Sequence, residues 1–437
     1  MRRKFLSVVL CVCMMLTMAP FAFAAGDNST TESTISSGGA SGGGSVTPVA
    51  QVGDTTYGTL RDAVAAVQDG GTVKLLRDAI GAGIGTYEIA GTDNQGNTKI
   101  TSKSFTIDFN GHTYSLNAPA VGSTGYETQG FHFEWSGSAE SIPTITLKNG
   151  TLDVASEHDS DMKLLIQNYC NLTLDNMVVD GSNLENGWGT YTYITSNCCG
   201  TTVIKDTKIF GGDAQKNVAF DVDGCRSAYA NTPVKITVEG NSEILGRIEV
   251  NDSDNKSANT LTVKGGSFTD VATAVKYAEN NATIKVAQDT TSDVVVPADK
   301  TITLDLNGNK LTNKTNHTIL NNGTLTITGT GTVDNVTHQK AALYNKGTAT
   351  LEGGTFDRTK ENGKTKGQSG NNSWYTIKNV GTMTVKDGVT VQTAGNNNSL
   401  GKFSSLVSNG YFDVSDFTNN KGIDNPILTI EGGNFIG

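Results

Sequence analysis

A short phrase that recurs along the C-terminal half of the chain constrains the fold more than any other feature. The phrase has the form Asn-x-Gly-Thr-h-Thr-h, where h is apolar, and it occupies residues 321–327, 345–351 and 379–385, with a variant at 408–414. The glycines of successive copies, Gly323, Gly347, Gly381 and Gly410, are 24, 34 and 29 residues apart. A pattern repeated at such an interval indicates a chain built from stacked, equivalent turns.

The N-terminal half follows the same pattern with more inserted sequence. Residues 168–174 and 197–203 match the phrase, with cysteine where the other copies have glycine. An interrupted match begins at residues 223–225 and resumes at residues 234–238. The whole chain beyond the first fifty residues therefore uses one repeating unit.

The chain also contains a duplication of a longer segment. Residues 59–75 are echoed by residues 267–286, and each copy leads to a Thr-h-Asp-h-Asn-Gly segment, at 106–111 and 303–308. Each copy opens with apolar residues at helical spacing, which predicts short amphipathic helices near 59–68 and 267–279. We interpret these helices as caps, because the open end of a strand stack needs covering.

Alternation of apolar and threonine side chains along each phrase predicts strands with one buried face. Strands and tight turns at a repeat in the twenties predict an all-β fold, namely a right-handed parallel β-helix in which each turn adds one layer to a continuous core. Asparagines at the same turn position of successive turns can then hydrogen-bond to one another. An all-β sandwich is the structural alternative, since short strands alone do not separate the two folds.

Four segments organise the chain. Basic residues followed by an apolar run and a small-residue site predict a signal peptide, and a Ser/Thr/Gly-rich stretch without an apolar face predicts a flexible linker. The predicted segments are the signal peptide at 1–24, the linker at 25–48, a first β-helix module at 49–266 and a second at 267–437.

The repeated Thr-h-Asp-h-Asn-Gly strand, the Asn-x-Gly-Thr turn and the short opening helix resemble the pectin-lyase-like right-handed β-helix repeats of Gram-positive surface proteins. The resemblance covers about residues 50 to 437. Its motifs are structural, so the resemblance implies the fold and says little of activity. It also implies polysaccharide cleavage as an alternative, although the Gly-His-Gly phrase of polygalacturonase-like hydrolases does not occur in this chain.

The export signal predicts a secreted or cell-surface protein without a transmembrane segment after cleavage of the signal. The formal net charge of −10 argues against nucleic acid as a partner. Residues 430–437 repeat the phrase of residues 263–268, which leads into the second module. Further β-helix modules or a capping partner at the C-terminus are therefore expected.

The chain beyond the signal has four cysteines: Cys170, Cys198, Cys199 and Cys225. Cys170, Cys199 and Cys225 fall at the same point of successive turns, where neighbours would lie about 4.8 Å apart. That separation suits either a disulfide or a stack of free thiols. We predict a structural role, with metal binding and nucleophilic catalysis as the alternatives.

Two groups of acidic residues are candidates for chemistry. Asp221, Asp223 and Arg226 are the best acid–base candidates for a lyase or a glycoside hydrolase acting on a pectin-like acidic polysaccharide. Glu157, Asp159 and Asp161 form a loop that could bind calcium, the one cofactor considered, although its spacing matches no known calcium loop. Since no catalytic set is complete, we expect neither an enzyme nor a required cofactor.

Aromatic residues give the best candidate for ligand binding. Trp188, Tyr191 and Tyr193 cluster in a polar, glycine-containing stretch, where rings can stack on sugars or pack beneath an insertion. Loops added to a rigid scaffold commonly carry specificity. The sequence thus predicts a non-catalytic, adhesin-like stalk or binding surface for glycans or host polymers, with a polysaccharide-cleaving enzyme and a purely structural surface repeat as alternatives.

Overall fold

The computed structural model describes residues 47–86, 103–120, 129–135, 142–159, 162–184, 191–224, 232–251, 258–337, 339–359, 375–393, 405–410 and 425–437. The predicted signal peptide and residues 25–46 of the predicted linker lie outside these segments. Strands hold 57 % of the described residues and helices 5 %, and the strands form parallel sheets, which confirms an all-β protein. Among the described residues, no helix has the length and apolar content needed to cross a bilayer.

The described strands form four sheets, which we name A, B, D and E. Sheet A contains β1 (Ala50–Val52), β2 (Thr55–Tyr57), β3 (Gly71–Leu75), β4 (Ala79–Ala82), β5 (Phe105–Asp108), β6 (Thr113–Ala118), β8 (Thr144–Val154), β10 (Asn171–Gly181), β12 (Gly200–Lys205), β13 (Lys208–Gly211), β15 (Val234–Glu239), β16 (Glu243–Leu245), β18 (Thr260–Phe268), β19 (Ala278–Val286), β22 (Thr301–Asp305), β25 (Thr324–Thr328), β28 (Thr348–Leu351), β31 (Thr382–Val385) and β34 (Ile427–Ile430). Sheet B contains β7 (Gln129–Phe133), β9 (Leu164–Asn168), β11 (Thr192–Asn197), β14 (Asn217–Val222) and β17 (Arg247–Val250). Sheet D contains β20 (Thr290–Thr291), β23 (Lys310–Thr312), β26 (Thr332–Asp334), β29 (Gly354–Asp357), β32 (Val389–Gln392) and β35 (Asn434–Ile436), and sheet E contains β21 (Val294–Val296), β24 (Ile319–Asn321), β27 (Leu343–Asn345), β30 (Tyr375–Asn379) and β33 (Ser405–Asn409).

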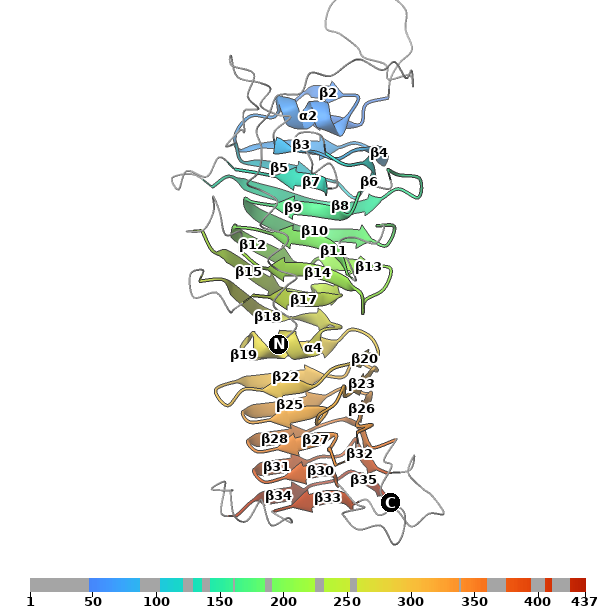
Figure 1. The fold of residues 1–437 in the computed structure, drawn as a ribbon, viewed down its shortest axis with the longest axis vertical. Coiled ribbons are helices and arrows are strands. Elements are labelled where there is room, and N and C mark those ends of the chain that lie inside the picture. Colours follow the sequence, from blue (N-terminus) through green and yellow to red (C-terminus); the bar gives the residue numbers. More distant parts are fainter. Residues whose placement is uncertain are drawn as a thin grey trace, which may run out of the picture.

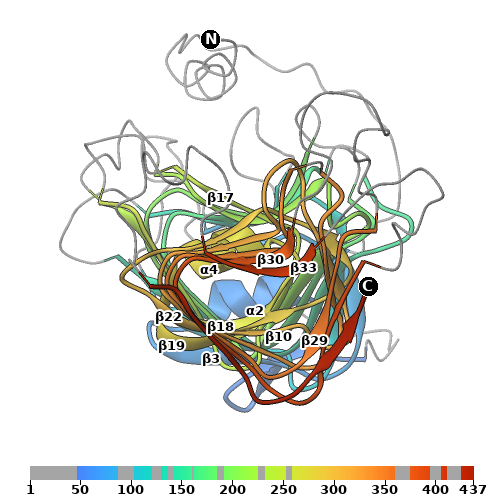
Figure 2. The same cartoon turned by 90° about the horizontal axis from the view of Figure 1, so that it is seen from below.

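Strands of one layer pair with the corresponding strands of the next layer. In the C-terminal half, β25, β26 and β27 pair in parallel with β28, β29 and β30, one pair in each of sheets A, D and E. The layers follow one another along the long axis of the molecule (Figure 1). Seen along that axis, β17, β30 and β33 lie on one side and β10, β18 and β19 on the other (Figure 2).

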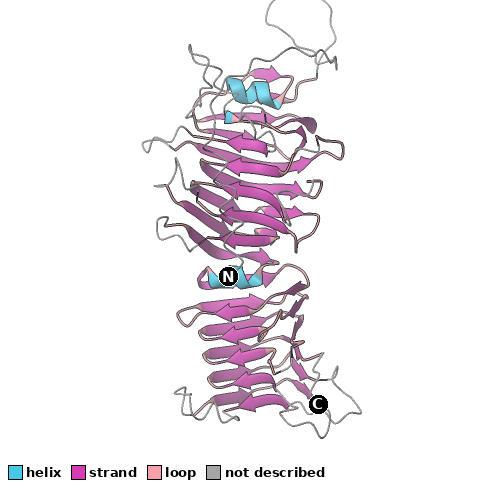
Figure 3. Ribbon diagram, in the orientation of Figure 1, coloured by secondary structure: helices cyan, strands magenta, loops and turns pink. Residues whose placement is uncertain are grey.

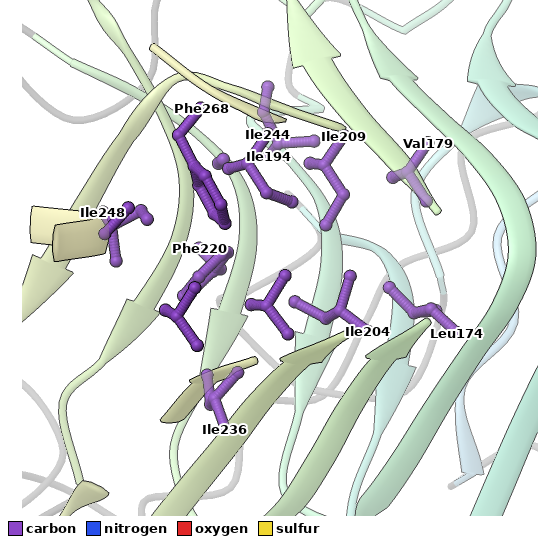
Figure 4. Packing of buried hydrophobic residues seen from close by; sticks show 14 of the residues in the cluster. Leu174, Val179, Ile194, Ile204, Ile209, Phe220, Ile236, Ile244, Ile248 and Phe268 are labelled. Atoms are coloured by element: carbon purple, nitrogen blue, oxygen red, sulfur yellow. The ribbon is translucent and has the colours of Figure 1, made fainter. Parts of the chain in front are cut away.

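The core lies between the sheets and runs along the stack. Strand alternation points Ile302 and Leu304 of β22 inward, where they meet Leu325 and Ile327 of β25 in register. All four side chains are buried. Figure 4 shows the same arrangement earlier in the chain, where side chains from sheets A and B, such as Ile204 and Phe220, share one interior.

Helix α2 (Leu60–Ala66) lies at the N-terminal end of the stack, within the segment where a helix is predicted (Figures 1 and 3). Its Leu60, Ala63 and Val64 side chains are buried against the first layer. Lys103 Nζ donates to the carbonyl oxygens of Val64, Ala65 and Val67 at 3.1, 3.2 and 2.6 Å. These carbonyls have no partner within the helix, so the lysine stabilises its C-terminal end.

Helix α4 (Val271–Lys276) lies inside the stack (Figure 3). The carboxylate of its N-cap residue, Asp270, accepts from the Ile248 N–H of β17 at 3.1 Å, and the Ala272 N–H donates to Ser292 Oγ at 3.2 Å. The helix thus stands between sheets B and E, whereas sheet A continues past it through the pairing of β18 with β19. The interpretation of both helices as caps over open ends therefore fits α2 only.

The predicted asparagine contacts are confirmed as a ladder inside the turn that follows sheet E. Asn321 Nδ2 donates to Asn345 Oδ1, Asn345 to Asn379, and Asn379 to Asn409, each at 2.7 Å. Each donor also reaches a backbone carbonyl in the next layer, as from Asn345 to Thr382 at 2.9 Å. The ladder fixes both the side chain and the backbone of the turn.

Close stacking of successive turns also explains why the repeated phrase contains glycine. A Cβ atom at position 347 would lie 2.0 Å from the Gly323 carbonyl oxygen, and one at position 381 would lie 2.1 Å from that of Gly347. No side chain fits at that distance, so these two turns can stack only with glycine at positions 347 and 381.

Replacing Asn345 by alanine should remove a link from both neighbours of the ladder. We expect Asn345→Ala to lower the free energy of unfolding by about 2–3 kcal/mol, because two buried amides each lose a partner. Thr326→Ala, on the outward face of β25, should change it by no more than about 0.5 kcal/mol. Chemical denaturation measures both values, and equal losses in the two variants would contradict the role of the ladder.

Candidate functional site

The outward side chains of sheet B and the residues that flank its strands include four of the candidates predicted from the sequence. We call this surface the sheet-B face, and its members are Tyr191, Tyr193, Ser196, Asp221, Asp223, Arg247, Glu249 and Asn251. They come from three neighbouring strands, β11, β14 and β17, which pair in parallel.

Strand register arranges these side chains in rows across the sheet. Tyr193 lies opposite Val218, and Val218 opposite Arg247. A register shift follows in β14 between residues 218 and 220. A second row then runs from Ser196 to Asp221 and on to Glu249, because Ser196 Oγ bonds to Asp221 and Asp221 is paired with Glu249. The inward neighbours on β14 are core residues, which leaves Asp221 pointing outward.

Asp221 is the most perturbed carboxylate of the face. It is only 9 % exposed, and its two oxygens accept from the Asn197 backbone N–H at 2.6 Å and from Ser196 Oγ at 2.9 Å. Burial raises the pKa of Asp221 to about 7, against the lowering effect of those two hydrogen bonds, and the charges of Asp223 and Glu249 raise it further. Asp221 therefore holds a proton at a pH where an exposed aspartate has none.

Two tyrosines, an arginine and a glutamate form a connected group beside Asp221. Tyr193 Oη donates to Glu249 Oε2 at 2.6 Å, and Arg247 Nη2 lies 3.5 Å from Glu249 Oε1. The Arg247 guanidinium stacks on the Tyr191 ring, 3.9 Å from the ring centroid. Burial and the contact with Glu249 raise the pKa of Tyr193 well above its usual range, so its hydroxyl stays a donor. All four side chains keep partial exposure.

Asp223 lies at the edge of this group, just after β14. Its Oδ1 accepts from Asn251 Nδ2 at 2.8 Å, and the side chain is partly exposed. The face thus offers two carboxylates, Asp223 and Glu249, whose oxygens are within reach of solvent, beside an aromatic ring and a cation. Hydroxyl donors can bind to such carboxylates, and apolar sugar faces can pack on such rings.

Sequence reasoning identified some members of the face and missed others. Asp221, Asp223, Tyr191 and Tyr193 are brought together, whereas the candidates Trp188 and Arg226 lie outside the described residues. Roles for Ser196, Arg247, Glu249 and Asn251 were not predicted. Arg247 and Glu249 alternate on β17, and alignment of the turns could have placed them on the outward side.

The acidic loop proposed for calcium connects β8 to β9. Glu157 and Asp159 are exposed in the loop after β8, and the Asp159 N–H donates to the Asn117 carbonyl oxygen at 2.8 Å. Asp161 lies outside the described residues. Within the described segments, no three His, Cys, Asp or Glu side chains converge as metal ligands.

Three of the cysteines are described, and they lie in the core next to sheet B. Cys170, Cys198 and Cys199 are buried, and Cys225 lies outside the described residues. Cys170 and Cys199 follow strands in which Asn168 is paired with Asn197, which places them on adjacent layers. Burial raises the pKa of the Cys170 thiol, and Cys199 and Glu134 add to the effect.

Among the thiols, Cys199 Sγ donates to the Tyr169 carbonyl oxygen at 3.0 Å, and Gln167 Nε2 donates to Cys198 Sγ at 3.1 Å. A buried thiol with a raised pKa is a poor nucleophile. A structural role remains our prediction for all four cysteines.

The buried Asp221 predicts a pH dependence of stability. Its folded pKa of about 7 lies above the value of about 3.9 in the unfolded chain, so the folded state alone holds this proton between those limits. The free energy of unfolding should therefore fall as the pH rises from about 4 to about 7, by on the order of 3 kcal/mol from this group. Asp221→Asn, which stays neutral, should remove that decline in chemical denaturation series.

Asp299→Asn provides the matched control, because Asp299 is exposed and lies far along the chain in the second half. It should keep the decline of the parent protein. The explanation fails if Asp221→Asn and the parent lose stability in parallel over this pH range.

Comparison with known proteins adds no relative from which a role could be transferred. No protein-family model, no curated protein and no solved structure matches the chain. The resemblance to pectin-lyase-like surface repeats thus stays a prediction based on the repeated phrases. The case for a function rests on the geometry of the sheet-B face.

Proposed function

We propose that the chain is a right-handed parallel β-helix outside the cell and that its sheet-B face binds a glycan without cleaving it. The parallel pairing of each layer with the next supports the helical path. The basic and apolar N-terminal segment of residues 1–24 supports export to the cell surface or the medium.

The observation that carries the binding proposal is the Tyr191–Arg247–Glu249–Tyr193 group with Asp223 beside it. Stacking of Arg247 on Tyr191 and the short Tyr193–Glu249 hydrogen bond hold these side chains in place before any ligand arrives. Side chains that are already ordered lose little entropy on binding. Carboxylates accept from sugar hydroxyls, and a guanidinium donates to them, so the group matches a hydroxyl-rich ligand.

The strands behind the face supply the rigidity that such a site needs. Strand β14 pairs with β11 on one side and with β17 on the other, and the inward side chains of these strands belong to the core. Sites on sheets keep their geometry better than sites on loops. A stack of layers also presents a long surface that suits an extended polymer.

A polysaccharide-cleaving enzyme is the second candidate, and one observation favours it. Asp221, with its pKa of about 7, lies near Asp223 and Glu249, and carboxyl groups with separated pKa values can act as acid and base. Against it, both oxygens of Asp221 already accept hydrogen bonds from β11, and the side chain is buried. A general acid must reach the leaving-group oxygen of its substrate. We therefore favour binding.

Removing the Tyr191 ring should weaken binding to whichever oligosaccharide a glycan array identifies. We expect Tyr191→Ala to raise the Kd about tenfold in titration calorimetry, because the ring and the placement of Arg247 are both lost. Phe210→Ala is the matched control. Phe210 also has a cation over its ring, with Lys208 Nζ 5.1 Å from the ring centroid, but it lies in sheet A. The control should leave the Kd unchanged.

Unchanged binding by Tyr191→Ala, or equal losses in both variants, would remove the aromatic group from the proposal. The same protein should release no unsaturated or reducing ends from pectin-like polysaccharide, with or without calcium. Release that Asp221→Asn abolishes would replace binding by catalysis. If the folded protein neither bound a glycan nor released ends from polysaccharide, it would be a purely structural surface repeat.

A further inference from the structure

A second cluster of functional side chains lies on sheet E, which takes the place of sheet B beyond helix α4. The outward row of sheet E runs from Leu320 of β24 to Tyr344 of β27 and Lys378 of β30, which are paired in register. Figure 2 shows β17, α4 and β30 on the same side of the molecule. The two clusters therefore occupy the same side of the stack at different heights.

Tyr344 is the centre of the sheet-E cluster. Lys346 Nζ lies 4.9 Å and Lys378 Nζ 5.0 Å from the centroid of its ring, at distances where an ammonium is attracted to the π-face. The His317 ring meets the same tyrosine edge-on, with the centroids 5.0 Å apart. Two ammonium groups and an imidazole therefore lie against the ring of Tyr344.

His317 adds a directed hydrogen-bond donor. The Ala341 backbone N–H donates to its Nδ1 at 2.8 Å, so Nδ1 accepts and the proton of the neutral ring lies on Nε2. Burial lowers the pKa of His317 to about 4, and the charges of Lys340, Lys378 and Lys346 lower it further. The imidazole is therefore neutral at physiological pH and surrounded by positive charge.

Six lysines elsewhere in the described stack pair with a carboxylate on a neighbouring layer. Such pairs are Lys148 with Asp108, Lys205 with Asp175, Lys208 with Glu243, Lys264 with Glu239, Lys310 with Asp334 and Lys386 with Glu352. Among the described residues, no carboxylate lies within 4.0 Å of the ammonium of Lys340 or Lys346. Lys346 is exposed and Lys340 partly exposed, whereas Lys378 is 2 % exposed.

We propose that Lys340, Lys346 and Lys378, gathered around Tyr344 and His317, form a binding site for an oxyanion carried by an acidic glycan, either a sulfate ester or a carboxylate. Lys340 and Lys346 contact the anion, and Lys378 supplies positive charge beside Tyr344. For Lys340 and Lys346, the anion takes the place that a carboxylate has beside the six paired lysines. This site does not depend on the sheet-B face, which is rich in carboxylates and suits hydroxyl donors.

The test compares three oligosaccharides of equal length, one sulfated, one built of uronic acids and one neutral, by titration calorimetry of the full chain at about 0.15 M salt. We expect at least one acidic probe to bind and the neutral probe to bind at least tenfold more weakly. Preference for the sulfated or the uronic acid probe identifies the source of the oxyanion. Equal binding of all three probes would overturn the proposal, as would no binding of either acidic probe.

The double variant K340A/K346A should weaken binding of the acidic probe at least tenfold. The matched control K285A/K300A removes the same charge from exposed or partly exposed lysines at other places in the second half, and should change the Kd by less than about twofold. Equal losses in the two double variants would show a response to overall charge and would overturn the site. The variant K340R/K346R should restore binding, because arginine keeps the charge and the donors.

The outcome is separable from that of the sheet-B proposal. Tyr191→Ala should leave binding of the acidic probe unchanged, since Tyr191 lies before α4 and Tyr344 beyond it. If Tyr191→Ala lost binding of the acidic probe and K340A/K346A kept it, the anion would lie on the sheet-B face, and the sheet-E site would be contradicted. Thermal unfolding of each variant checks that it is folded.

Discussion

The register between successive layers is the constraint on which the rest of the structure depends. Parallel hydrogen bonds join each strand to its counterpart one layer away, and the asparagine ladder locks the turn that follows sheet E. The ladder tolerates a variable chain length between its members, since its neighbours are 24 residues apart in one step and 34 in the next. It does not tolerate a slip, because a shift by one residue would move every inward side chain to the outside.

The two surface clusters are consequences of that register. Tyr193 and Glu249 are 56 residues apart in sequence, yet they share a hydrogen bond because β11, β14 and β17 stack with one outward side. On sheet E the same stacking places Lys378 directly beside Tyr344. Helix α4 divides the two sheets and so separates an acidic, aromatic surface from a basic one. One scaffold can thus offer two chemically different surfaces on the same side.

The local sequence predicts much of the fold but few of the residues that form the two surface clusters. The phrase Asn-x-Gly-Thr indicates both the ladder and the glycine that close stacking requires, and helical spacing places α2. The location of α4 inside the stack depends on pairing of β18 with β19, which spacing alone does not reveal. The sequence does not show that Arg247 lies beside Tyr191, or Lys346 near His317. These contacts depend on pairing between distant strands and on turns of unequal length. Trp188 and Arg226 lie outside the described residues, so their part in the site stays a prediction.

Disulfide trapping across one layer tests the register most directly. Residues 267–437 contain no cysteine, and Thr326 of β25 lies opposite Thr350 of β28. Paired residues on adjacent strands are about 4.8 Å apart, within the span of a disulfide, whereas residues offset by two positions are more than about 7 Å apart. The account predicts that Thr326→Cys with Thr350→Cys cross-links on mild oxidation and that Thr326→Cys with Thr348→Cys does not. Cross-linking of the offset pair in preference to the first would contradict it.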